Sequence, residues 1–237
     1  MKEVLNNYWD DVDVNLSRLL ETGYVKLPSL SEFPLNDWSE NIVSEMGGKT
    51  FVESSFAHEQ ILDSLGIREM LAPKLFEIAT NKLGYGGDIS NQYHIARRVD
   101  AGNSIEKYRA HFDSHLFTLV IPLKIPVASA DGSSGDLIFF PQARKSPSNE
   151  LRNFVSKIYF KQFGSQKGLA KLSCQKTHVL EDFQDCRPLL FIGNTTLHAN
   201  KEVSLDCSTY RLTLLAHFFD PSPKIGVGSV MRFLRGR

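Results

Sequence analysis

The feature that most constrains the fold of this chain is a change of hydrophobic period near residue 89. From there on, apolar and polar residues alternate in short runs that are separated by Gly, Pro, Asp and Asn. A period of two is typical of half-buried β-strands. We predict six strands, over residues 91–99, 107–113, 116–123, 136–140, 188–192 and 210–219. Short strands punctuated by turn residues predict a β-sandwich or a jelly roll.

The first 88 residues have a mainly helical pattern instead. Residues 15–20 have helical spacing, and Gly23 after them predicts a helix stop. Residues 24–27 alternate and predict a short strand. A second helix is expected over residues 74–79, because Pro73 suits the first turn of a helix. This region therefore predicts a helical support for the strands that follow.

A basic segment, residues 141–187, interrupts the strand pattern. Ser146 and Pro147 predict a helix start. After them, apolar residues recur with helical spacing at positions 151, 154, 155, 158 and 159. Residues 141–176 carry eight Lys or Arg and one acidic residue. The segment is either a solvated helix lying across the strands or a lid that attracts an anionic substrate.

The chain length predicts one domain. A chain of 237 residues can bury a sizeable core, and no flexible linker divides it. We expect a single domain over residues 1–237, with helical support in 1–88, strands in 89–140 and 188–220, and a helical insertion in 141–187.

Charge and cysteine usage exclude several classes of protein. Lys plus Arg and Asp plus Glu both number 27, so a dedicated nucleic-acid binder is not expected. Three cysteines without a CxxC pair favour a reducing compartment. The sequence contains no apolar run of 18 residues and no N-terminal targeting pattern. We expect a cytoplasmic protein without a membrane span.

A His-x-Asp motif lies in one predicted strand. On a strand, His111 and Asp113 point the same way, about 6.6 Å apart along the backbone, and can converge on one metal ion. His115 shares that face but lies about 13 Å from His111, so we assign it to the substrate pocket. Alone, this motif also arises by chance in proteins without a metal.

A third candidate ligand is His198, which follows the apolar strand at 188–192. Two histidines and one carboxylate leave three positions of an octahedral metal open, as in non-heme Fe(II) oxygenases. The same ligands suit Zn²⁺, although the chain has no HExxH motif. A lone His at a strand end is otherwise an ordinary hydrogen-bonded residue.

Arg211 and Thr213 share one face of the last predicted strand. An Arg inside an apolar strand needs a partner, because an unpaired buried charge is costly. A carboxylate cosubstrate fits, since a guanidinium binds it through two hydrogen bonds and a hydroxyl adds a third. The alternatives are a structural Asp or Glu, or an outward-facing Arg on an edge strand.

Together these residues resemble the Fe(II)- and 2-oxoglutarate-dependent dioxygenases, in particular the prolyl-hydroxylase-like and phytanoyl-hydroxylase-like branches. The resemblance covers about residues 90–220. The segments that carry it are His111-x-Asp113, residues 118–123, 135–139 and 197–199, Arg211-x-Thr213, and His217-Phe218-Phe219. Their order and approximate spacing match the family.

The resemblance implies a mainly β fold with flanking helices, a double-stranded β-helix or jelly-roll, cupin-like barrel. It implies Fe(II) bound by His111, Asp113 and His198, and 2-oxoglutarate held by Arg211 with Thr213 assisting. With O2, such an enzyme hydroxylates an unactivated C–H bond and releases succinate and CO2. The retained Asp113 favours hydroxylation or a related oxidation, because family halogenases replace it with a small residue.

The sequence departs from the closer branches near residue 97. Where related proteins often have a Tyr before a Pro-Gly turn, this chain has Arg97 and Arg98. If Arg97 faces inward, it can contact the C1 carboxylate of 2-oxoglutarate or an anionic substrate. If it faces outward, Arg98 takes the inner position.

Three kinds of function remain open. We expect an oxygenase acting on a small molecule, with the basic residues favouring a carboxylate- or phosphate-bearing substrate. The same chemistry could act on a protein side chain or a nucleic-acid base, which would require a docking surface beside the metal. The third alternative is a jelly-roll protein that binds a metal without turnover. The oligomeric state is undetermined.

Overall fold

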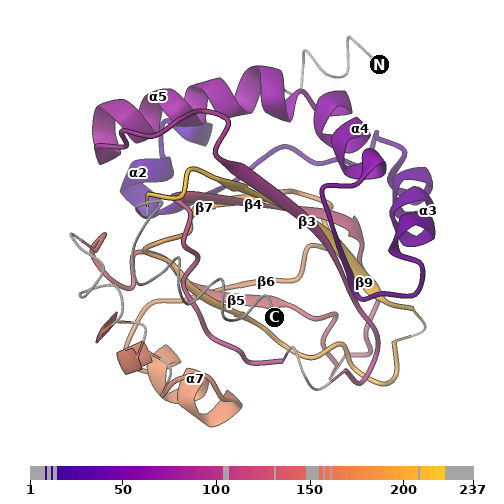
Figure 1. Ribbon diagram of the computed structural model, residues 1–237. Coiled ribbons are helices and arrows are strands. Elements are labelled where there is room, and N and C mark those ends of the chain that lie inside the picture. The colour runs from indigo at the N-terminus through magenta and orange to yellow at the C-terminus, as the bar shows by residue number, and fades with distance from the viewer. Residues whose placement is uncertain are drawn as a thin grey trace.

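The structure is a computed structural model that describes residues 9, 12, 15–103, 107–130, 132–147, 155, 156, 158–160, 162–207 and 209–221. Its strands form two antiparallel sheets, one above the other in Figure 1. The larger has the order β1-β7-β4-β9-β3-β2, with β1 at Tyr24–Lys26, β2 at Phe51–Glu53, β3 at Gln92–Val99, β4 at Phe117–Lys124, β7 at Leu189–Ile192 and β9 at Arg211–Phe218. The smaller has the order β6-β5-β8, with β5 at Leu137–Phe140, β6 at Val179–Glu181 and β8 at Leu197–Asn200.

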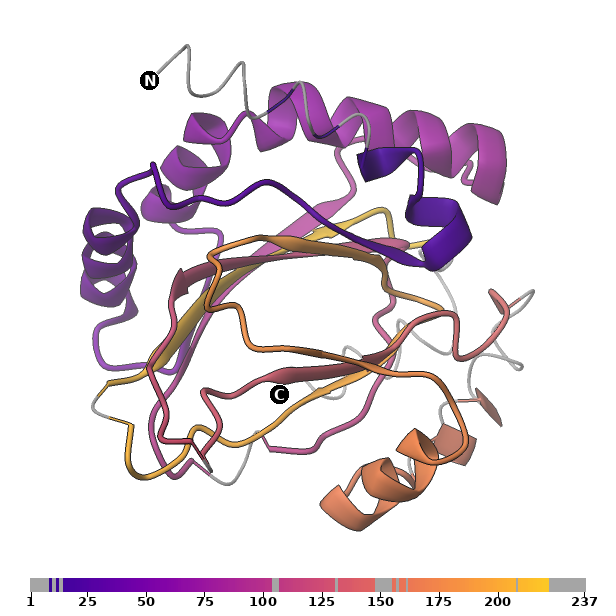
Figure 2. The ribbon, with the colours of Figure 1, turned by 180° about the vertical axis from the view of Figure 1, so that it is seen from behind.

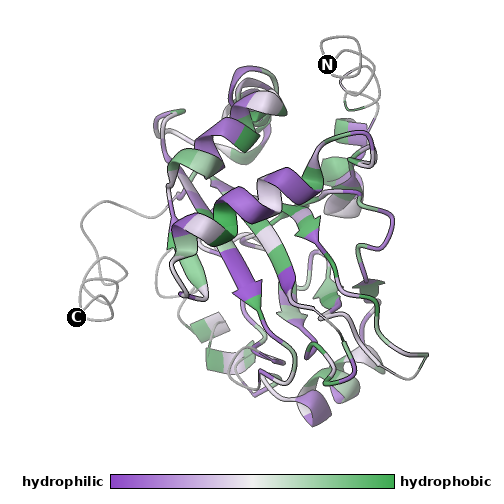
Figure 3. Cartoon of the chain, turned by 90° about the vertical axis from the view of Figure 1, so that its right-hand side faces the viewer, coloured by the Kyte–Doolittle hydropathy of each residue, from purple (hydrophilic) through white to green (hydrophobic). Residues whose placement is uncertain are grey.

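The N-terminal helices cover the outer face of the larger sheet (Figures 1 and 2). They are α2 at Leu19–Thr22, α3 at Leu35–Met46, α4 at Phe56–Ser64, a π-helical turn η1 at Ile67–Leu71, and α5 at Ala72–Leu83. Figure 3 shows hydrophilic and hydrophobic residues alternating along the helices, as one buried and one solvated side require. Gly23 and Gly84, both at positive φ, end α2 and α5.

Side chains alternate along the long central strands, so one face of the larger sheet lies in the hydrophobic core and the other face lines a cavity. Leu212, Leu214 and Ala216 of β9 pack with the helices in the main hydrophobic core. Arg211, Thr213, Leu215 and His217 take the other face and line a cavity between the two sheets. Because successive strand residues point to opposite faces, one strand supplies both the core and the site.

The predicted mainly β jelly roll with flanking helices is confirmed, although the two sheets do not close into a continuous barrel in the described part of the chain. Five of the six predicted strands are present as β3, β4, β5, β7 and β9. The predicted strand at 107–113 is wrong. Tyr108 has φ +56°, which a strand cannot accommodate, and only His111 forms an isolated bridge, to His198.

The helical part of the basic insertion packs on the side of the smaller sheet away from the larger sheet (Figure 1). Its described helix, α7, spans Gln166–Ser173. Phe160, Phe163, Leu169 and Leu172 are buried there against Phe140 of β5 and Leu197 of β8. The helical spacing of positions 151, 154, 155, 158 and 159 predicted one apolar helix face packed on the protein. This is wrong for Val155, Ile158 and Tyr159, whose side chains are more than half exposed. Positions 151 and 154 of the same predicted helix face lie outside the described residues. The prediction of a purely helical insertion is wrong at residues 179–181, which form β6 in the smaller sheet.

No helix within the described ranges combines the length and the apolar character needed to cross a bilayer. The three cysteines are free, with Cys174 exposed, Cys186 partly exposed and Cys207 buried.

The start of α4 contains a titratable capping group. Ser55 Oγ accepts from the backbone N–H of His58, and His58 Nδ1 accepts from the backbone N–H of Ser55 at 2.8 Å. His58 is fully buried, and burial lowers its pKa to about 4. An accepting Nδ1 means that the folded protein holds this imidazole neutral, with its hydrogen on Nε2.

We expect the protein to lose stability as pH falls from 6.5 to about 4. In this window the unfolded chain protonates His58 while the folded chain does not, which costs about 3 kcal/mol by pH 4. His58→Gln keeps a side-chain acceptor at this capping position without titrating. In urea unfolding, the wild type should therefore lose more stability than the variant between pH 7 and pH 4. Equal losses would contradict the assignment.

Candidate metal centre and cavity

A cavity of about 330 Å³ lies between the two sheets. Its apolar wall includes Val120 of β4, Leu137 of β5 and Phe191 of β7. Its polar wall consists of Thr50, just before β2, and of residues from β3, β4, β8, β9 and the loop before β4: Tyr93, Arg97, Arg98, His111, Asp113, Thr118, His198, Asn200, Arg211, Thr213 and His217. Six of the seven predicted site residues line this one cavity, and the seventh, His115, does not.

His111, Asp113 and His198 form a cluster at one end of the cavity. Asp113 Oδ1 lies 3.7 Å from Nε2 of His111 and 3.7 Å from Nε2 of His198. One ligand atom from each residue lies within 4.8 Å of those from the others, close enough to hold one metal ion. Asp113 and His198 have side chains only 10% exposed, whereas that of His111 is 51% exposed. The cluster therefore lies between the closed interior and solvent.

Backbone pairing brings these distant residues together. His111 and His198 exchange two backbone hydrogen bonds of 3.0 Å, although 107–113 is otherwise a loop. Asp113 N–H donates to Gly193 O, in the turn between β7 and β8, at 3.2 Å. The loop is thus docked on β8 and on the turn before it, which aligns three ligands from two segments.

The ring orientation of both histidines suits metal binding. His111 Nδ1 lies 2.8 Å from Arg109 O, and His198 Nδ1 lies 3.3 Å from Thr196 O. A carbonyl only accepts, so both Nδ1 atoms carry the hydrogen and donate. The Nε2 lone pairs then face Asp113, as in metal sites where a second hydrogen bond fixes the imidazole tautomer.

The protonation states also suit a metal. Burial would by itself raise the pKa of Asp113, but the neighbouring His198, His217 and His111 and the Thr118 hydrogen bond hold it well below its usual range. Burial lowers the pKa of His198 to about 4, so its imidazole is neutral near pH 7. A carboxylate and neutral imidazoles are the forms that ligate metals.

Arg211 is buried at the beginning of β9, in the same cavity. It is 4% exposed, and its Nη1 donates to Gly135 O at 2.7 Å and to Asn200 Oδ1 at 2.8 Å. Burial lowers its pKa to about 10, so it stays protonated at neutral pH. Both hydrogen bonds come from Nη1 and go to neutral oxygens, so neither neutralises the guanidinium.

The structure decides the orientation of Arg97. Tyr93, Ile95, Arg97 and Val99 of β3 all line the cavity, so Arg97 faces inward. It pairs in register with Thr213, whose neighbour two residues earlier on the same face is Arg211. Burial, with the nearby charge of Arg109, lowers the pKa of Arg97.

Arg98 is held differently from Arg97. Its guanidinium lies 4.2 Å from the centre of the Tyr210 ring and forms an ion pair of 2.7 Å with Asp100. Arg98 also contributes to the lining of the cavity, but its guanidinium is paired with Asp100, whereas Arg97 shares its strand face with Tyr93, Ile95 and Val99.

His115 lies against the cavity wall from behind. Its ring stacks on His217, with centroids 5.1 Å apart, and on Tyr93, at 6.2 Å. His217 and Tyr93 themselves line the cavity. His115 lies in the bend just before β4 and touches the cavity wall only through these rings, so its assignment to the substrate pocket stays a prediction.

Besides Thr50 and Tyr93, three polar cavity residues received no role from the sequence: Thr118, Asn200 and His217. Two of them could have been found from strand periodicity. On β9, His217 is an even number of residues from Arg211 and Thr213 and therefore points to the same face of the strand. On β4, Thr118 shares a face with Val120. Asn200 lies two residues after His198 on β8 but had no such pattern, because β8 was not predicted.

No known protein-family model matches this sequence, and no curated protein sequence matches it. Solved structures do match. A prolyl-4-hydroxylase from Pseudomonas putida is 14% identical with a TM-score of 0.53, over 87% of this chain and 93% of that one. The non-heme α-ketoglutarate-dependent carbocyclase SnoK, from nogalamycin biosynthesis, is 13% identical with a TM-score of 0.55, over 92% and 89%. HygX from Streptomyces hygroscopicus, solved with iron bound, is 11% identical with a TM-score of 0.52, over 86% and 85%.

The chain therefore has the fold of the Fe(II)- and 2-oxoglutarate-dependent oxygenases. At these identities the likeness establishes the fold, and the chemistry has to be argued from the site. The site contains two histidines and one carboxylate at one end of a cavity that Arg97, Arg211 and Thr213 also line.

Proposed function

We propose that this protein is a non-heme Fe(II)- and 2-oxoglutarate-dependent oxygenase that hydroxylates an unactivated C–H bond of a small anionic molecule. The observation that carries the proposal is the shared cavity. The His111–Asp113–His198 cluster and the buried cation Arg211 line the same cavity of about 330 Å³. A metal site that served only stability would not need a buried guanidinium in the same space.

The donor set fits iron. Two neutral imidazole nitrogens and one carboxylate oxygen, all on one side of the ion, are the ligands of non-heme Fe(II) oxygenases, which keep open positions for the reactants. The Nδ1–carbonyl bonds of His111 and His198 orient both rings toward Asp113 without the metal. When bound, iron and 2-oxoglutarate supply the oxidation of a C–H bond, with conversion of the oxoacid to succinate and CO2.

The role of Arg211 follows from its partners. Gly135 O and Asn200 Oδ1 hold one end of the guanidinium at Nη1, which fixes its plane. The remaining N–H groups can then bind a carboxylate, such as that of 2-oxoglutarate, through two charge-assisted hydrogen bonds. Thr213 lies two residues on along the same face and can add its hydroxyl.

The apolar wall has a role of its own. Val120, Leu137, Phe191 and Leu215 line the cavity between the polar groups. They exclude water from the reacting atoms, which strengthens every charge interaction inside the site and protects a reactive oxidant.

The cavity also supports the substrate class. Arg97 gives the cavity a second inward guanidinium next to Thr213. Asp113 is the only acidic residue among the described residues that line it. A cavity of about 330 Å³ is at the small end of ligand sites, which favours a small molecule bearing a carboxylate or a phosphate.

The proposed function is tested by an anaerobic titration of metal-free protein with Fe(II) and then 2-oxoglutarate. A weak visible charge-transfer band of the iron-bound oxoacid is expected, and it should require both additions. Well-folded, iron-loaded protein without the band would overturn the cosubstrate assignment. A metal-binding jelly roll without turnover would then be the better interpretation.

The anionic substrate class is tested with the variant Arg97→Gln. With a panel of small carboxylic acids and their neutral amides, we expect substrate-dependent succinate release only from acids. Arg97→Gln should lower kcat/KM for an active acid about tenfold or more, which corresponds to one charge-assisted hydrogen bond. Activity on the amide equal to that on the acid, or an unchanged kcat/KM in the variant, would contradict the role of Arg97.

A further inference from the structure

The carboxylate of Asp113 is held from behind by a chain of hydrogen bonds. Its Oδ1 faces the two histidine Nε2 atoms, whereas its Oδ2 lies 2.5 Å from Thr118 Oγ1. Thr118 Oγ1 in turn lies 3.1 Å from His217 Nδ1. Asp113, Thr118 and His217 come from a loop, from β4 and from β9, so three separate segments meet at this chain of contacts.

The direction of each hydrogen bond follows from the chemistry of the groups. Thr118 Oγ1 donates to Asp113 Oδ2, so the single hydroxyl hydrogen of Thr118 is used in that bond. Thr118 Oγ1 must then accept from His217, which places a hydrogen on His217 Nδ1. The order is therefore His217 Nδ1–H to Thr118 Oγ1–H to Asp113 Oδ2.

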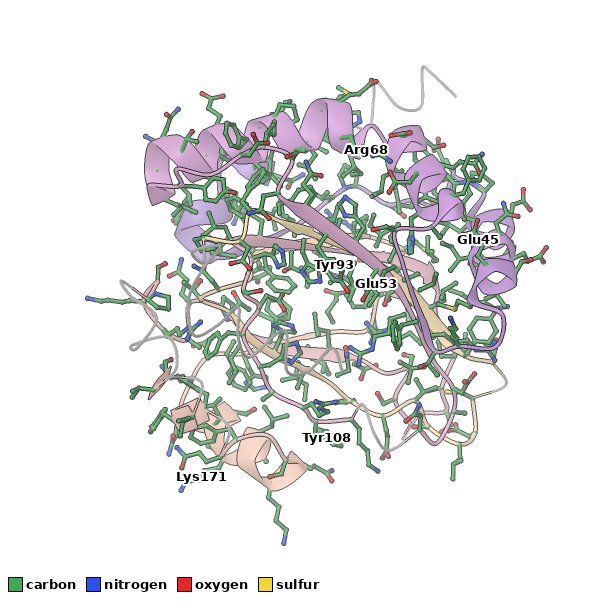
Figure 4. The ribbon with its side chains drawn as sticks, in the orientation of Figure 1. Glu45, Glu53, Arg68, Tyr93, Tyr108 and Lys171 are labelled. Carbon is green, nitrogen blue, oxygen red and sulfur yellow. The ribbon has the colours of Figure 1, made fainter. Side chains whose placement is uncertain are left out.

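The His217 ring packs in a cluster of three rings with His115 and Tyr93, which also stack on each other at 6.2 Å. It stacks on His115 at 5.1 Å and on Tyr93 at 5.9 Å between centroids. The Tyr93 hydroxyl donates to Glu53 Oε1 of the edge strand β2 at 2.5 Å, and Figure 4 shows these two side chains next to each other. These contacts restrain the plane of the imidazole, and the hydrogen bond with Thr118 sets which ring nitrogen faces the hydroxyl.

The space around Thr118 is also closed. A Cβ added to Gly193 would lie 2.8 Å from Thr118 Oγ1 and 3.0 Å from Asp113 Cβ. The backbone of the turn between β7 and β8 thus packs directly against both side chains. No rearrangement of Thr118 or Asp113 toward this side is possible, which holds the geometry of the hydrogen bonds constant.

We propose that Thr118 and His217 are positioning residues for Asp113, and that their ordered hydrogen bonds tie Oδ2 so that only Oδ1 is offered to a metal. A carboxylate free to rotate can present both oxygens and fill a position that the reaction needs open. This inference depends on one part of the proposed function, namely that His111, Asp113 and His198 bind a divalent metal.

The first test is a titration of metal-free protein with Co(II), followed by visible absorption. Thr118→Val keeps the shape of the side chain and removes the hydroxyl. We expect it to weaken Co(II) binding about 10- to 100-fold, the usual effect of losing a partner of a metal ligand, and to change the Co(II) spectrum. Thr118→Ser should restore both. Thr80→Val on α5, far from the cavity and also losing hydroxyl bonds, should leave both unchanged.

The second test separates the donor of His217 from its ring. His217→Asn places a donor near the position of Nδ1, whereas His217→Phe keeps a stacking ring and has no donor. We expect His217→Phe to weaken Co(II) binding about tenfold, the effect of one lost charge-linked hydrogen bond, and His217→Asn to stay near the wild type. Nitrogen NMR of ¹⁵N-histidine-labelled, metal-free protein should show the His217 hydrogen on Nδ1, and this preference should disappear in Thr118→Val.

Two results would overturn the proposal: wild-type Co(II) affinity and spectrum in both Thr118→Val and His217→Phe, or a His217 hydrogen on Nε2. Failure of the proposed function looks different. If the Co(II) and NMR results are as expected but Fe(II) and 2-oxoglutarate give no charge-transfer band, the positioning roles stand and the oxygenase assignment fails.

Discussion

Replacement of His198 by alanine is expected to abolish the charge-transfer band and to weaken Fe(II) binding by at least about 100-fold, more than the loss of an outer partner costs. His198 provides one of three ligand atoms, and its Nε2 lies 3.7 Å from Asp113 Oδ1. Its backbone pairing with His111 does not involve the side chain, so the loop stays docked in the variant. The loss of Fe(II) affinity in the variant then measures the contribution of the His198 imidazole as a metal ligand.

The measurement is an anaerobic Fe(II) titration of the metal-free protein, with circular dichroism to check folding. His178→Ala is the matched control, because His178 is an exposed histidine that lies outside the cavity. It should bind Fe(II) as the wild type does. Retention of the band and of wild-type Fe(II) affinity in His198→Ala would remove His198 from the metal site.

Replacement of Arg211 by alanine is expected to leave Fe(II) binding nearly unchanged and to weaken 2-oxoglutarate binding about 100-fold or more. Two charge-assisted hydrogen bonds are lost together, and each contributes about 1.5–3 kcal/mol. Arg211→Lys should recover part of the affinity, since an ammonium keeps the charge but not the paired geometry. The binding constant is obtained from the intensity of the band against 2-oxoglutarate concentration.

Arg187→Ala is the matched control for this experiment. Like Arg211, Arg187 donates to backbone carbonyls, those of Leu27 and Lys26, but it lies outside the cavity. It should bind 2-oxoglutarate as the wild type does. Undiminished 2-oxoglutarate affinity in Arg211→Ala would assign the buried guanidinium a purely structural role, in contact with Gly135 and Asn200.

The two variants distinguish the two halves of the site. His198→Ala should lose the metal and therefore also the cosubstrate complex, whereas Arg211→Ala should lose only the cosubstrate. This asymmetry is expected because, within the described part of the chain, His198 contacts Thr196 and Asp113 through its side chain, whereas Arg211 binds Gly135 and Asn200. Equal losses of Fe(II) affinity in both variants would indicate that Arg211 supports the fold of the metal site instead.

Local pattern was sufficient to predict much of the fold. The positions of β3, β4, β5, β7 and β9 follow from alternation and turn residues, because a strand with one face toward the core must repeat every two residues. The strand predicted at 24–27 is present as β1. The strands β2, β6 and β8, of three or four residues, were not predicted, because their segments lack a recognisable alternation between turn residues.

The candidate site was predicted for a partly wrong reason. His111 and Asp113 were expected to converge because they share a face of a strand, but they lie on a loop that is docked on β8. The residues are adjacent because of one bridge to His198 and one bond to Gly193. Residue type and spacing therefore identified the ligands, whereas the backbone that aligns them is set by contacts between distant segments.

The sequence by itself determined which residues can do chemistry and that Arg97, Arg211 and Thr213 lie on strands, since periodicity and residue type are local properties. Only the tertiary structure decided that Arg97 faces the cavity, that Arg211 is held by neutral oxygens, and that Thr118 and His217 reach Asp113. Each of these depends on which face of a strand is inside and on the register between strands far apart in the chain. A shift of one residue in that register would turn every side chain of the strand to the other face.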